Sequence, residues 1–252
     1  MNIFRQMVTR GWILATVLVI AGAALCVRLG IWQLDRLEQR RAFNDQVTSM
    51  RALSPMDLNM DTSSDPTTME YRAVVASGDY DFENQIVIRN QYYEGRYGYH
   101  LLTPLRLPDG RAVLVDRGWI PSEGNDSPDG WTRYATASPA EVRGVMRLGQ
   151  SKPDFGGVPD PTLAPGQLRL DIWNFVNTDR IAAQMPYPLL PVYIQLDIDV
   201  NDTEPPIPQQ PIIELTEGPH FGYALQWFTF AIILLIGYPF FIRRQLTENT
   251  SQ

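Results

Sequence analysis

The chain has 252 residues, of which 44% are hydrophobic and 19% charged, and its formal net charge is −7. This length accommodates one domain of ordinary size plus membrane segments, and the negative charge argues against nucleic acid as a partner. Cys26 is the single cysteine, so an intrachain disulfide and a cysteine-rich metal site are both excluded. It lies in an apolar segment, where a small buried hydrophobic side chain is the interpretation that we favour.

The first apolar segment predicts a transmembrane helix over residues 11–32, after a cytoplasmic N-terminus of residues 1–10. Trp12 and Trp32 would lie about 30 Å apart along that helix, which matches the distance between the two interfacial belts of a bilayer. Arg28 lies near the outer end, from where its side chain can reach the membrane surface. A cleaved signal peptide is the alternative, but the length of the segment and the lack of a clear cleavage site favour a retained anchor.

A second charge-free segment predicts a transmembrane helix over residues 219–242, with a reach of roughly 36 Å. Arg243 and Arg244 follow it. Cytoplasmic flanks of membrane helices are rich in Lys and Arg, so both termini, including residues 243–252, are predicted to be cytoplasmic. Residues 33–218 would then form an extracytoplasmic domain.

The region between the spans changes character along the chain. Residues 33–50 keep helix-forming residues and predict a helical extension of the first span. Residues 54–68 are rich in Pro, Ser, Thr and Asp, which is typical of a linker. Residues 202–211 carry four prolines and predict a stiff, extended spacer.

Residues 70–200 are predicted to be β-rich because apolar and polar residues alternate with a period of two. The sequence Pro108-Asp109-Gly110 predicts a turn, and a short helix is expected to begin at Asn177 or Thr178. The predicted strands cover residues 71–77, 85–89, 98–105, 112–116, 140–148, 168–175 and 192–197. The fold class that we expect is membrane α+β, with a hairpin of two transmembrane helices flanking a mainly antiparallel small barrel or sandwich.

Chemistry is limited by the supply of histidine, because only His100 and His220 are present. The sequence contains no Gly-x-Ser-x-Gly motif and no glycine-rich phosphate loop. His100 stands in a predicted strand, where a solvated or locally hydrogen-bonded histidine is the favoured interpretation. We therefore predict a non-enzymatic protein with no catalytic residue and no metal site apart from a possible haem iron.

His220 begins the second span, and Tyr223 and Trp227 follow it on the same helical stripe. A neutral imidazole at the membrane surface could be an axial ligand of a haem iron. Arg28 and Arg36 could then pair with the haem propionates. Alternatively, the histidine anchors the helix start at headgroup depth and the aromatic residues form an interfacial belt. The residues alone favour this structural alternative.

Trp32, Gln33 and Arg36 allow the same two interpretations. A tryptophan at an interface needs no further function. Gln33 and Arg36 are three positions apart, so they would face one side of the helix and could bond the outer domain.

Four sequence blocks in order along the chain carry a resemblance to a known family. They read LGIWQLDRL at residues 29–37, GYHLLTPL at 98–105, VLVDRGWIP at 113–121 and HFGYALQWF at 220–228. Together they resemble the surfeit-locus (Surf/Shy) family of cytochrome c oxidase assembly factors. The block residues that we single out as a structural motif are Gly30, Gln33, Arg117, Gly118, Trp119 and Pro121.

The resemblance implies an accessory protein of the bacterial cell membrane that assists biogenesis of a haem-copper terminal oxidase. Its partners would be oxidase subunit I and other assembly factors, and its cofactor would be haem a. His220 corresponds to the histidine ligand of the family, and Tyr223 and Trp227 to the aromatic residues that follow it. Many relatives place an asparagine shortly before this histidine, whereas Gly218 and Pro219 stand here.

Three functions remain open at this point. The protein holds or delivers haem a to subunit I, or it is a haem-free scaffold that contacts the oxidase subunit, or it is a membrane-anchored β-domain hydrolase or sensor. For the Arg-Gly-Trp block we expect a structural role, in which Gly118 permits a bend, Trp119 fills the core and Arg117 pairs with a carboxylate.

Overall fold

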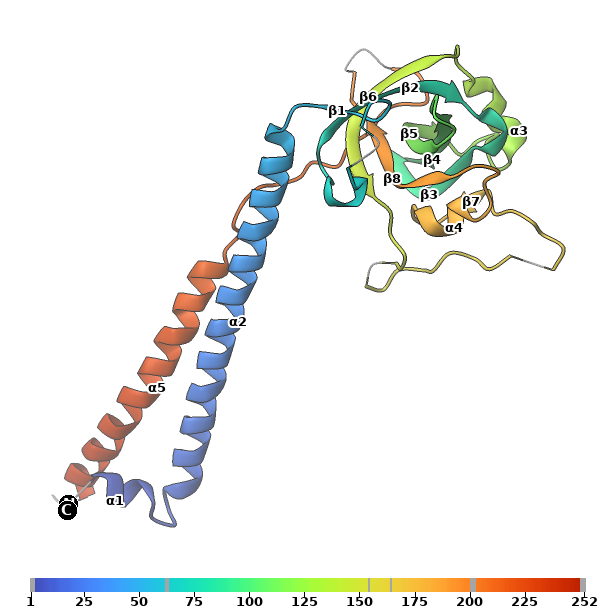
Figure 1. The fold of residues 1–252 in the computed structure, drawn as a ribbon. Helices are drawn as coiled ribbons and strands as arrows, with labels where there is room; N and C mark the ends of the chain where they lie inside the picture. Colours follow the sequence, from blue (N-terminus) through green and yellow to red (C-terminus); the bar gives the residue numbers. More distant parts are fainter. Residues whose placement is uncertain (1–2, 62–63, 154, 164, 200–202, 250–252) are drawn as a thin grey trace. The chain divides into compact units, whose positions relative to one another are not determined.

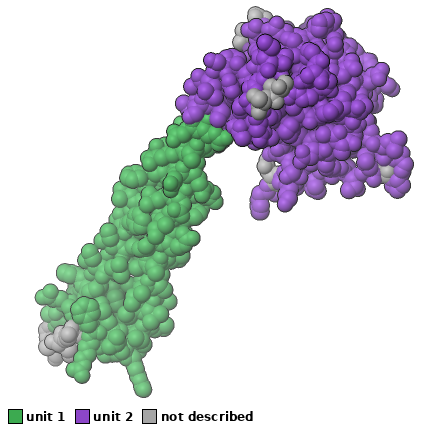
Figure 2. Space-filling model, in the orientation of Figure 1, with its two compact units in different colours: residues 1–46, 214–252 green, residues 47–213 purple. Residues whose placement is uncertain are grey.

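The structure is a computed structural model that describes residues 3–61, 64–153, 155–163, 165–199 and 203–249. The chain divides into two compact units (Figure 2). One unit consists of residues 1–46 and 214–252, and the other of residues 47–213. The first unit contains two long helices and the second a β-sheet domain (Figure 1).

The two long helices are α2 (Ile13–Ala52) and α5 (His220–Asn249), and the short helix α1 (Ile3–Met7) precedes them. Both long helices are long and apolar enough to cross a membrane. The predicted extension over residues 33–50 is present as the continuation of α2. The end of α5 lies beyond the predicted span because charged residues after Ile242 are also compatible with a helix.

The buried residues of α2 within the first unit recur every seven residues, at Thr16, Ala23, Gly30 and Leu37. On α5, Ala224 and Ala231 are buried with the same spacing. A seven-residue repeat keeps one stripe of a helix facing a neighbouring helix, and small residues on that stripe allow a close approach. Each of the two helices thus buries a stripe of mostly small residues.

Contacts between α2 and α5 occur along both helices. The hydroxyl oxygens of Thr16 and Tyr238 are 2.7 Å apart, and the rings of Trp12 and Phe241 meet edge to face with centroids 6.1 Å apart. At Gly30 an added Cβ would lie 2.7 Å from the Phe228 ring. A side chain at position 30 would therefore force the Phe228 ring to shift.

The second unit is a β-barrel-like domain built from one sheet of eight strands in the order β1-β2-β6-β8-β5-β4-β3-β7. Strand β2 also pairs with β4, which closes β2, β6, β8, β5 and β4 into a ring (Figure 1). The pairings are antiparallel except for β1–β2, β3–β7 and β5–β8. The strands are β1 (Met56–Asp57), β2 (Ala73–Tyr80), β3 (Ile86–Tyr93), β4 (Arg96–Arg106), β5 (Ala112–Pro121), β6 (Ala140–Leu148), β7 (Ile172–Trp173) and β8 (Leu189–Leu196).

Short helical turns connect these strands. They are η1 (Pro66–Thr68), η2 (Phe82–Asn84), α3 (Pro128–Trp131), η3 (Thr132–Tyr134) and α4 (Thr178–Ala182). The side chain of Asn177 accepts a hydrogen bond from the backbone N–H of Arg180, so the predicted N-cap of α4 is confirmed. Gly110, in the predicted turn, has the positive φ of 89° that glycine tolerates.

Two segments differ from the sequence-based predictions. Residues 54–68 were predicted to be a linker, but they contribute β1, and Leu58 is buried in the core. Two apolar residues, Met56 and Leu58, attach this segment to β2. They do not stand out in the sequence because most of the surrounding residues are polar. The predicted strand over residues 168–175 pairs with β3 only at Ile172–Trp173. Side-chain hydrogen bonds fix the residues before this pair.

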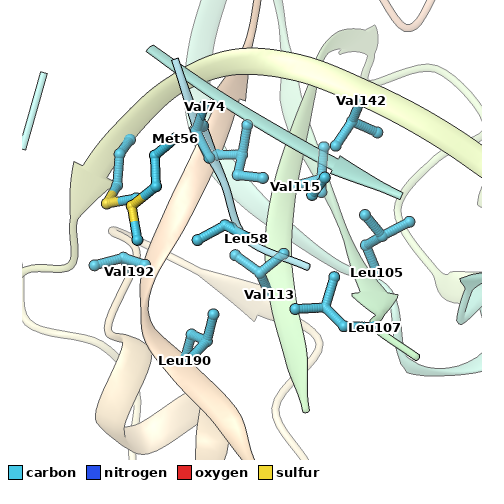
Figure 3. Close-up of a cluster of buried hydrophobic side chains, with 13 residues drawn as sticks. Met56, Leu58, Val74, Leu105, Leu107, Val113, Val115, Val142, Leu190 and Val192 are labelled. Atoms are coloured by element: carbon cyan, nitrogen blue, oxygen red, sulfur yellow. The ribbon is translucent and has the colours of Figure 1, made fainter. Parts of the chain in front are cut away.

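The main hydrophobic cluster fills the interior of the ring of strands (Figure 3). Leu105, Val113 and Val192 are fully buried there, together with Leu58 and Val74. Each strand contributes side chains from one face, as the two-residue period requires. Burying an aliphatic side chain of this size contributes about 1.5–3 kcal/mol, so this cluster is a main source of stability.

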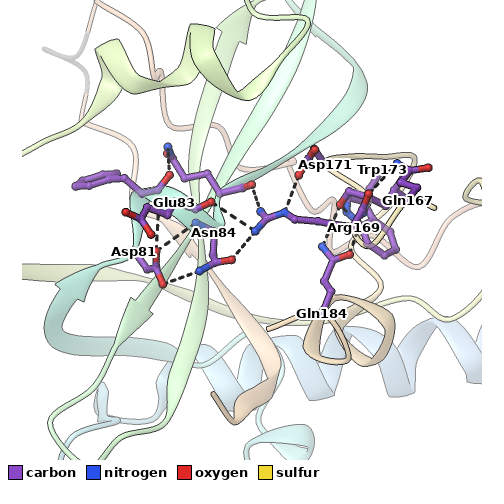
Figure 4. A network of polar contacts seen from close by, with 11 residues as sticks. Asp81, Glu83, Asn84, Gln167, Arg169, Asp171, Trp173 and Gln184 are labelled. Carbon is purple, nitrogen blue, oxygen red and sulfur yellow. Dashed lines mark hydrogen bonds and ion pairs between the residues drawn. The ribbon is translucent and has the colours of Figure 1, made fainter. Parts of the chain in front are cut away.

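A polar network around Arg169 attaches the segment before β7 to η2 and the start of β3 (Figure 4). The Arg169 guanidinium donates to the carboxylate of Asp171 at 2.6 Å and to the carbonyl oxygen of Gln85. Gln184 from the end of α4 donates to the carbonyl oxygen of Leu170 at 3.0 Å. These bonds replace a strand ladder over this part of the chain.

The proline-rich segment is not a free spacer. The backbone N–H of Trp119 donates to the carbonyl oxygen of Ile207 at 2.8 Å, and Ile207 N–H donates back to Trp119 at 2.9 Å. Ile207 is also buried. The described part of the predicted spacer over residues 202–211 thus pairs with β5 at one residue, Ile207. Residues 201 and 202 lie outside the described residues.

Candidate functional site

His220 is the first residue of α5 and makes one side-chain hydrogen bond to α2. Its Nδ1 lies 2.9 Å from Oε1 of Gln33. An amide oxygen only accepts, so the ring must carry its proton on Nδ1, and the lone pair of neutral His220 is then on Nε2. This is the tautomer that an iron ligand needs, held by a partner on its other nitrogen.

Gly218 lies beside the edge of the His220 ring that carries Nε2. Gly218, with a φ of 67°, precedes the helix, and an added Cβ there would lie 3.6 Å from Nε2. Pro219 then supplies a fixed φ at the helix start, and its carbonyl oxygen accepts from Tyr223 N–H at 3.1 Å. Gly218 and Pro219 therefore shape the helix start, and a side chain at position 218 would contact the Nε2 edge of the ring.

A cluster of polar side chains on α2 holds the segment before α5. Arg40 donates to the carbonyl oxygens of Thr216 and Glu214, and Arg41 donates to both carboxylate oxygens of Glu217 at 2.7 and 2.9 Å. Asn44 donates to the Thr216 carbonyl at 3.3 Å. The sequence predicted none of these pairs, because only the register between the helices brings the residues together.

Other predicted site residues lie on the same two helices. Trp32 is exposed, and the Arg36 guanidinium lies 5.7 Å above its ring. Arg36 also donates to Gln39 at 2.9 Å. Gln33 and Arg36 thus bond within the first unit, and the expected bonds to the outer domain are absent from the described contacts. Arg28 is exposed and has no hydrogen bond or ion pair within the described part of the chain.

The aromatic residues after His220 differ in burial. Tyr223 is 48% exposed, whereas Trp227 is half-buried and meets the ring of Phe230 edge to face at 6.0 Å. Trp227 follows His220 by seven residues and shares the spacing of the buried stripe. Of the two, Trp227 is therefore the less exposed.

In the Arg-Gly-Trp block, the expected carboxylate partner of Arg117 is wrong. Arg117 is buried, and its guanidinium lies 5.2 Å from the Tyr80 ring and 5.6 Å from the Phe82 ring. It donates from Nη2 to the Tyr134 carbonyl at 2.6 Å, while Nη1 has no hydrogen-bond partner among the described atoms. Burial lowers the pKa of Arg117, and the rings compensate in part for its lost hydration.

The other residues of this block lie where β5 meets the proline-rich segment. Gly118 has a φ of 111°, and an added Cβ would lie 2.1 Å from the Ile207 carbonyl oxygen. Trp119 is fully buried, with a centroid distance of 5.4 Å to the Tyr93 ring. Pro121 ends β5 opposite Gly98. The block therefore fixes the crossing between β5 and the proline-rich segment.

His100 is buried and bonded at both ring nitrogens. Nδ1 lies 2.9 Å from Oδ2 of Asp116, and Nε2 lies 2.9 Å from Oε1 of Gln209. The other Asp116 oxygen accepts from Gly118 N–H at 3.0 Å. Burial by itself would lower the pKa of His100, but the Asp116 carboxylate and the two hydrogen bonds outweigh it and raise the pKa above its usual 6.5.

We expect this network to make stability depend on pH near and above neutrality. A raised folded-state pKa contributes stability that is complete below the unfolded-state pKa and is lost as pH rises through the folded-state value. The free-energy difference between the wild type and His100→Gln should therefore be largest at acid pH and shrink as pH rises. Denaturant unfolding of the full chain across pH measures it.

The control is Asp109→Asn. Hydrogen bonds from Arg111 outweigh the desolvation of Asp109 and lower the pKa of its carboxyl group. Its contribution is therefore lost only as pH falls, in the opposite direction to that of His100. A His100→Gln difference that stays constant with pH, or grows as pH rises, would contradict the assigned hydrogen bonds.

Comparisons with known proteins place these residues in a family context. The model of the SURF1 family matches residues 20–232. An uncharacterized SURF1-like protein of Mycobacterium tuberculosis is 29% identical over 237 residues, which cover 92% of this chain and 83% of that protein. Surfeit locus protein 1 of Takifugu rubripes is 24% identical over 218 residues, covering 79% of this chain and 85% of that protein.

A SURF1-like protein of Caenorhabditis elegans extends the range of relatives to a nematode. It is 23% identical over 246 residues, which cover 89% of this chain and 73% of that protein. The matched region of the family model runs from within α2 to within α5 and includes the whole β domain. The chain belongs to the SURF1 family.

Proposed function

We propose that this protein assists the biogenesis of a haem-copper terminal oxidase and holds haem a through His220 for delivery to subunit I. Membership of the SURF1 family, known generally for cytochrome oxidase assembly, supports the first part. The hydrogen bond between His220 Nδ1 and Gln33 Oε1 supports the second, and it is the observation that carries the haem assignment.

In this proposal α2 and α5 cross the bacterial cell membrane as a hairpin. Both helices pass the length and hydropathy requirement for a span, and their contacts run from the Thr16–Tyr238 hydrogen bond to the Arg41–Glu217 ion pair. Arg243 and Arg244 follow the second apolar segment, which favours cytoplasmic termini and an extracytoplasmic β domain.

The residues around His220 fit the binding of a haem. Gln33 orients the ring and leaves Nε2 as the axial donor, and Gly218 places no side chain against that nitrogen. Trp227, seven residues after His220 on α5, would provide an apolar wall. The haem would supply the iron and its redox chemistry, and the protein would bind and orient it.

The propionates require cations at the outer end of the hairpin. Arg28 is exposed and has no partner within the described part of the chain, so its guanidinium is available for a carboxylate. Arg36 is also exposed and is bonded only to a neutral amide, Gln39. Trp32, beneath Arg36, would hold the guanidinium near the membrane surface.

A haem-free scaffold is the second candidate, and exposed apolar side chains favour it. Phe155, Val158 and Leu168 are all more than half exposed in the loop between β6 and β7. Apolar side chains on a protruding loop commonly mark a protein contact. In this alternative the β domain binds the oxidase subunit, and His220 only anchors the start of α5.

Complementation of a gene deletion tests the proposal. The deletion strain should lose terminal oxidase activity in its membranes, the wild-type gene should restore it, and His220→Ala should restore about a tenth or less. The control is Gln39→Ala, on the same helix as Gln33, which should restore full activity. Intact oxidase activity in the deletion strain would overturn the assembly function. Full restoration by His220→Ala would overturn haem holding alone and favour the scaffold.

A further inference from the structure

The β domain contains a cleft of about 1030 Å³ that the proposed haem site does not use. Strand β3 contributes Gln91 and Tyr93 to its lining, and β8 contributes Tyr193 and Gln195. The bonded segment 207–212 forms one side. We call this the β-domain cleft; it is large enough for a ligand well above the size of a single amino acid.

The charged groups beside the cleft are largely neutralised by one another. Arg147 donates to the Glu70 carboxylate at 3.2 Å, and the buried His100 is bonded to Asp116. The remaining acid, Asp199, is exposed at the edge of the lining. The four charged groups within the wall are therefore paired with one another, and an uncharged ligand matches the cleft best.

Carboxamide groups dominate the polar lining. An amide side chain donates and accepts at once, so a row of them matches the alternating N–H and C=O groups of a peptide backbone. Tyrosine rings add flat contact area at low entropic cost, a combination also used by antibody binding sites. The carboxamides are those of Gln91, Gln150, Asn174, Gln195, Gln209 and Gln210. Asn174 uses both of its polar atoms within the domain, whereas each of the five glutamines keeps at least one polar atom without a hydrogen bond to the described residues.

The domain already binds extended pieces of its own chain beside this cleft. Strand β7 pairs with β3 only at Val87 and Ile88, and Ile207 pairs with the edge of β5 at Trp119. Beyond Ile88, the outer edge of β3 has no strand partner in the described part of the chain. An unpaired strand edge is a template for one more extended segment.

Tyr71 also lines the β-domain cleft, and its backbone is strained. Its φ is 73°, an uncommon conformation for a bulky side chain, and it is nevertheless buried with the Arg147 guanidinium 5.0 Å from its ring. Backbone strain of this kind is concentrated at ligand sites, where surrounding contacts hold a side chain in place.

From these observations we infer that the β-domain cleft binds an extended, uncharged segment of a partner polypeptide. The segment would add to the free edge of β3, and its backbone would bond the carboxamides of the lining. The inference does not rest on His220 or on haem.

A matched pair of tyrosines tests this. Tyr93 lines the cleft, whereas Tyr92, the next residue of β3, is 65% exposed and does not line it. Full-length protein in nanodiscs is panned against phage-displayed libraries of random uncharged, acidic and basic short peptides. The best peptide is then synthesised, and its binding to each variant is measured by fluorescence anisotropy.

We expect the peptide selected most strongly to be an uncharged one. Its affinity should be about tenfold weaker for Tyr93→Ala than for the wild type, and should change less than about twofold for Tyr92→Ala. Because Tyr93 also packs on Trp119, Gln91→Ala is a second variant and should weaken binding as well. His220→Ala should bind the peptide normally, which separates this site from the haem site. Failure to recover a peptide, a charged winner, or equal effects of Tyr92→Ala and Tyr93→Ala would overturn the inference.

Discussion

A Gly118→Ala substitution is expected to destabilise the β domain by about 3 kcal/mol or more. Gly118 has a φ of 111°, which side-chain-bearing residues rarely adopt, and the added Cβ would overlap the Ile207 carbonyl carbon at 2.3 Å. Neither group can move freely, because Ile207 is bonded to Trp119 in both directions. The substitution should therefore break the crossing between β5 and the proline-rich segment.

Gly110→Ala is the matched control. Gly110 also has a positive φ, of 89°, but an added Cβ would have no atom within 4 Å. It should incur only the conformational cost of about 1–2 kcal/mol. The difference between the two variants isolates the steric contact with Ile207.

Denaturant unfolding of the full chain measures the free energies of unfolding. Hydrogen exchange at the Ile207 amide reports the crossing itself, because this amide donates to Trp119. Exchange there should accelerate in Gly118→Ala and not in Gly110→Ala. Equal stability of the two variants would show that the close approach at Gly118 does not constrain the fold.

Much of the architecture could be predicted from local patterns. The two apolar helices follow from charge-free segments of sufficient length, and the strands from two-residue alternation. Strand β4 is predicted almost to its ends because its apolar run is bounded by clear turn residues. Such features depend on neighbours in sequence, which a single chain displays directly.

Features that depend on distant residues could not be predicted in the same way. The His100–Gln209 bond joins a strand to a segment that composition describes only as proline-rich. Arg117 was assigned a carboxylate because buried guanidinium groups usually have one, yet two aromatic rings surround it. Sequence specifies which groups need partners, but the choice of partner depends on tertiary packing.

The pair formed by His220 and Gln33 also combines features that the sequence displays with one that depends on packing. His220 stands out in the sequence as a histidine at the start of a span, and Gln33 as part of a motif. Their pairing requires the register between α2 and α5, which small residues such as Gly30 and Ala231 set by packing. Only this register brings the two side chains within hydrogen-bond distance.

Loss of His220 is expected to have the second large effect, the loss of bound haem. An axial nitrogen has no substitute in His220→Ala, since His100 is bonded at both ring nitrogens in the other unit. Gln33 should act through the orientation of His220. Gln33→Leu should weaken haem binding by about 10–100-fold, the usual effect of removing the partner of a ligating histidine.

Gln33→Glu separates orientation from packing. A carboxylate still accepts a hydrogen bond from Nδ1–H, so this variant should bind haem nearly as well as the wild type. Gln39→Leu, on the same helix, should have no effect, because Gln39 bonds Arg36 and not His220. An equal loss in Gln33→Glu and Gln33→Leu would contradict the role of Gln33 as a hydrogen-bond acceptor.

The visible spectrum of the purified protein tests the central claim most directly. The full chain is co-expressed with the enzymes of haem a synthesis, purified in detergent and compared with its variants. We predict a Soret band in the wild type and in Gln33→Glu, a weak one in Gln33→Leu, and none in His220→Ala. A wild-type protein that purifies without haem, or a His220→Ala protein with an unchanged spectrum, would contradict the assignment of His220 as the ligand.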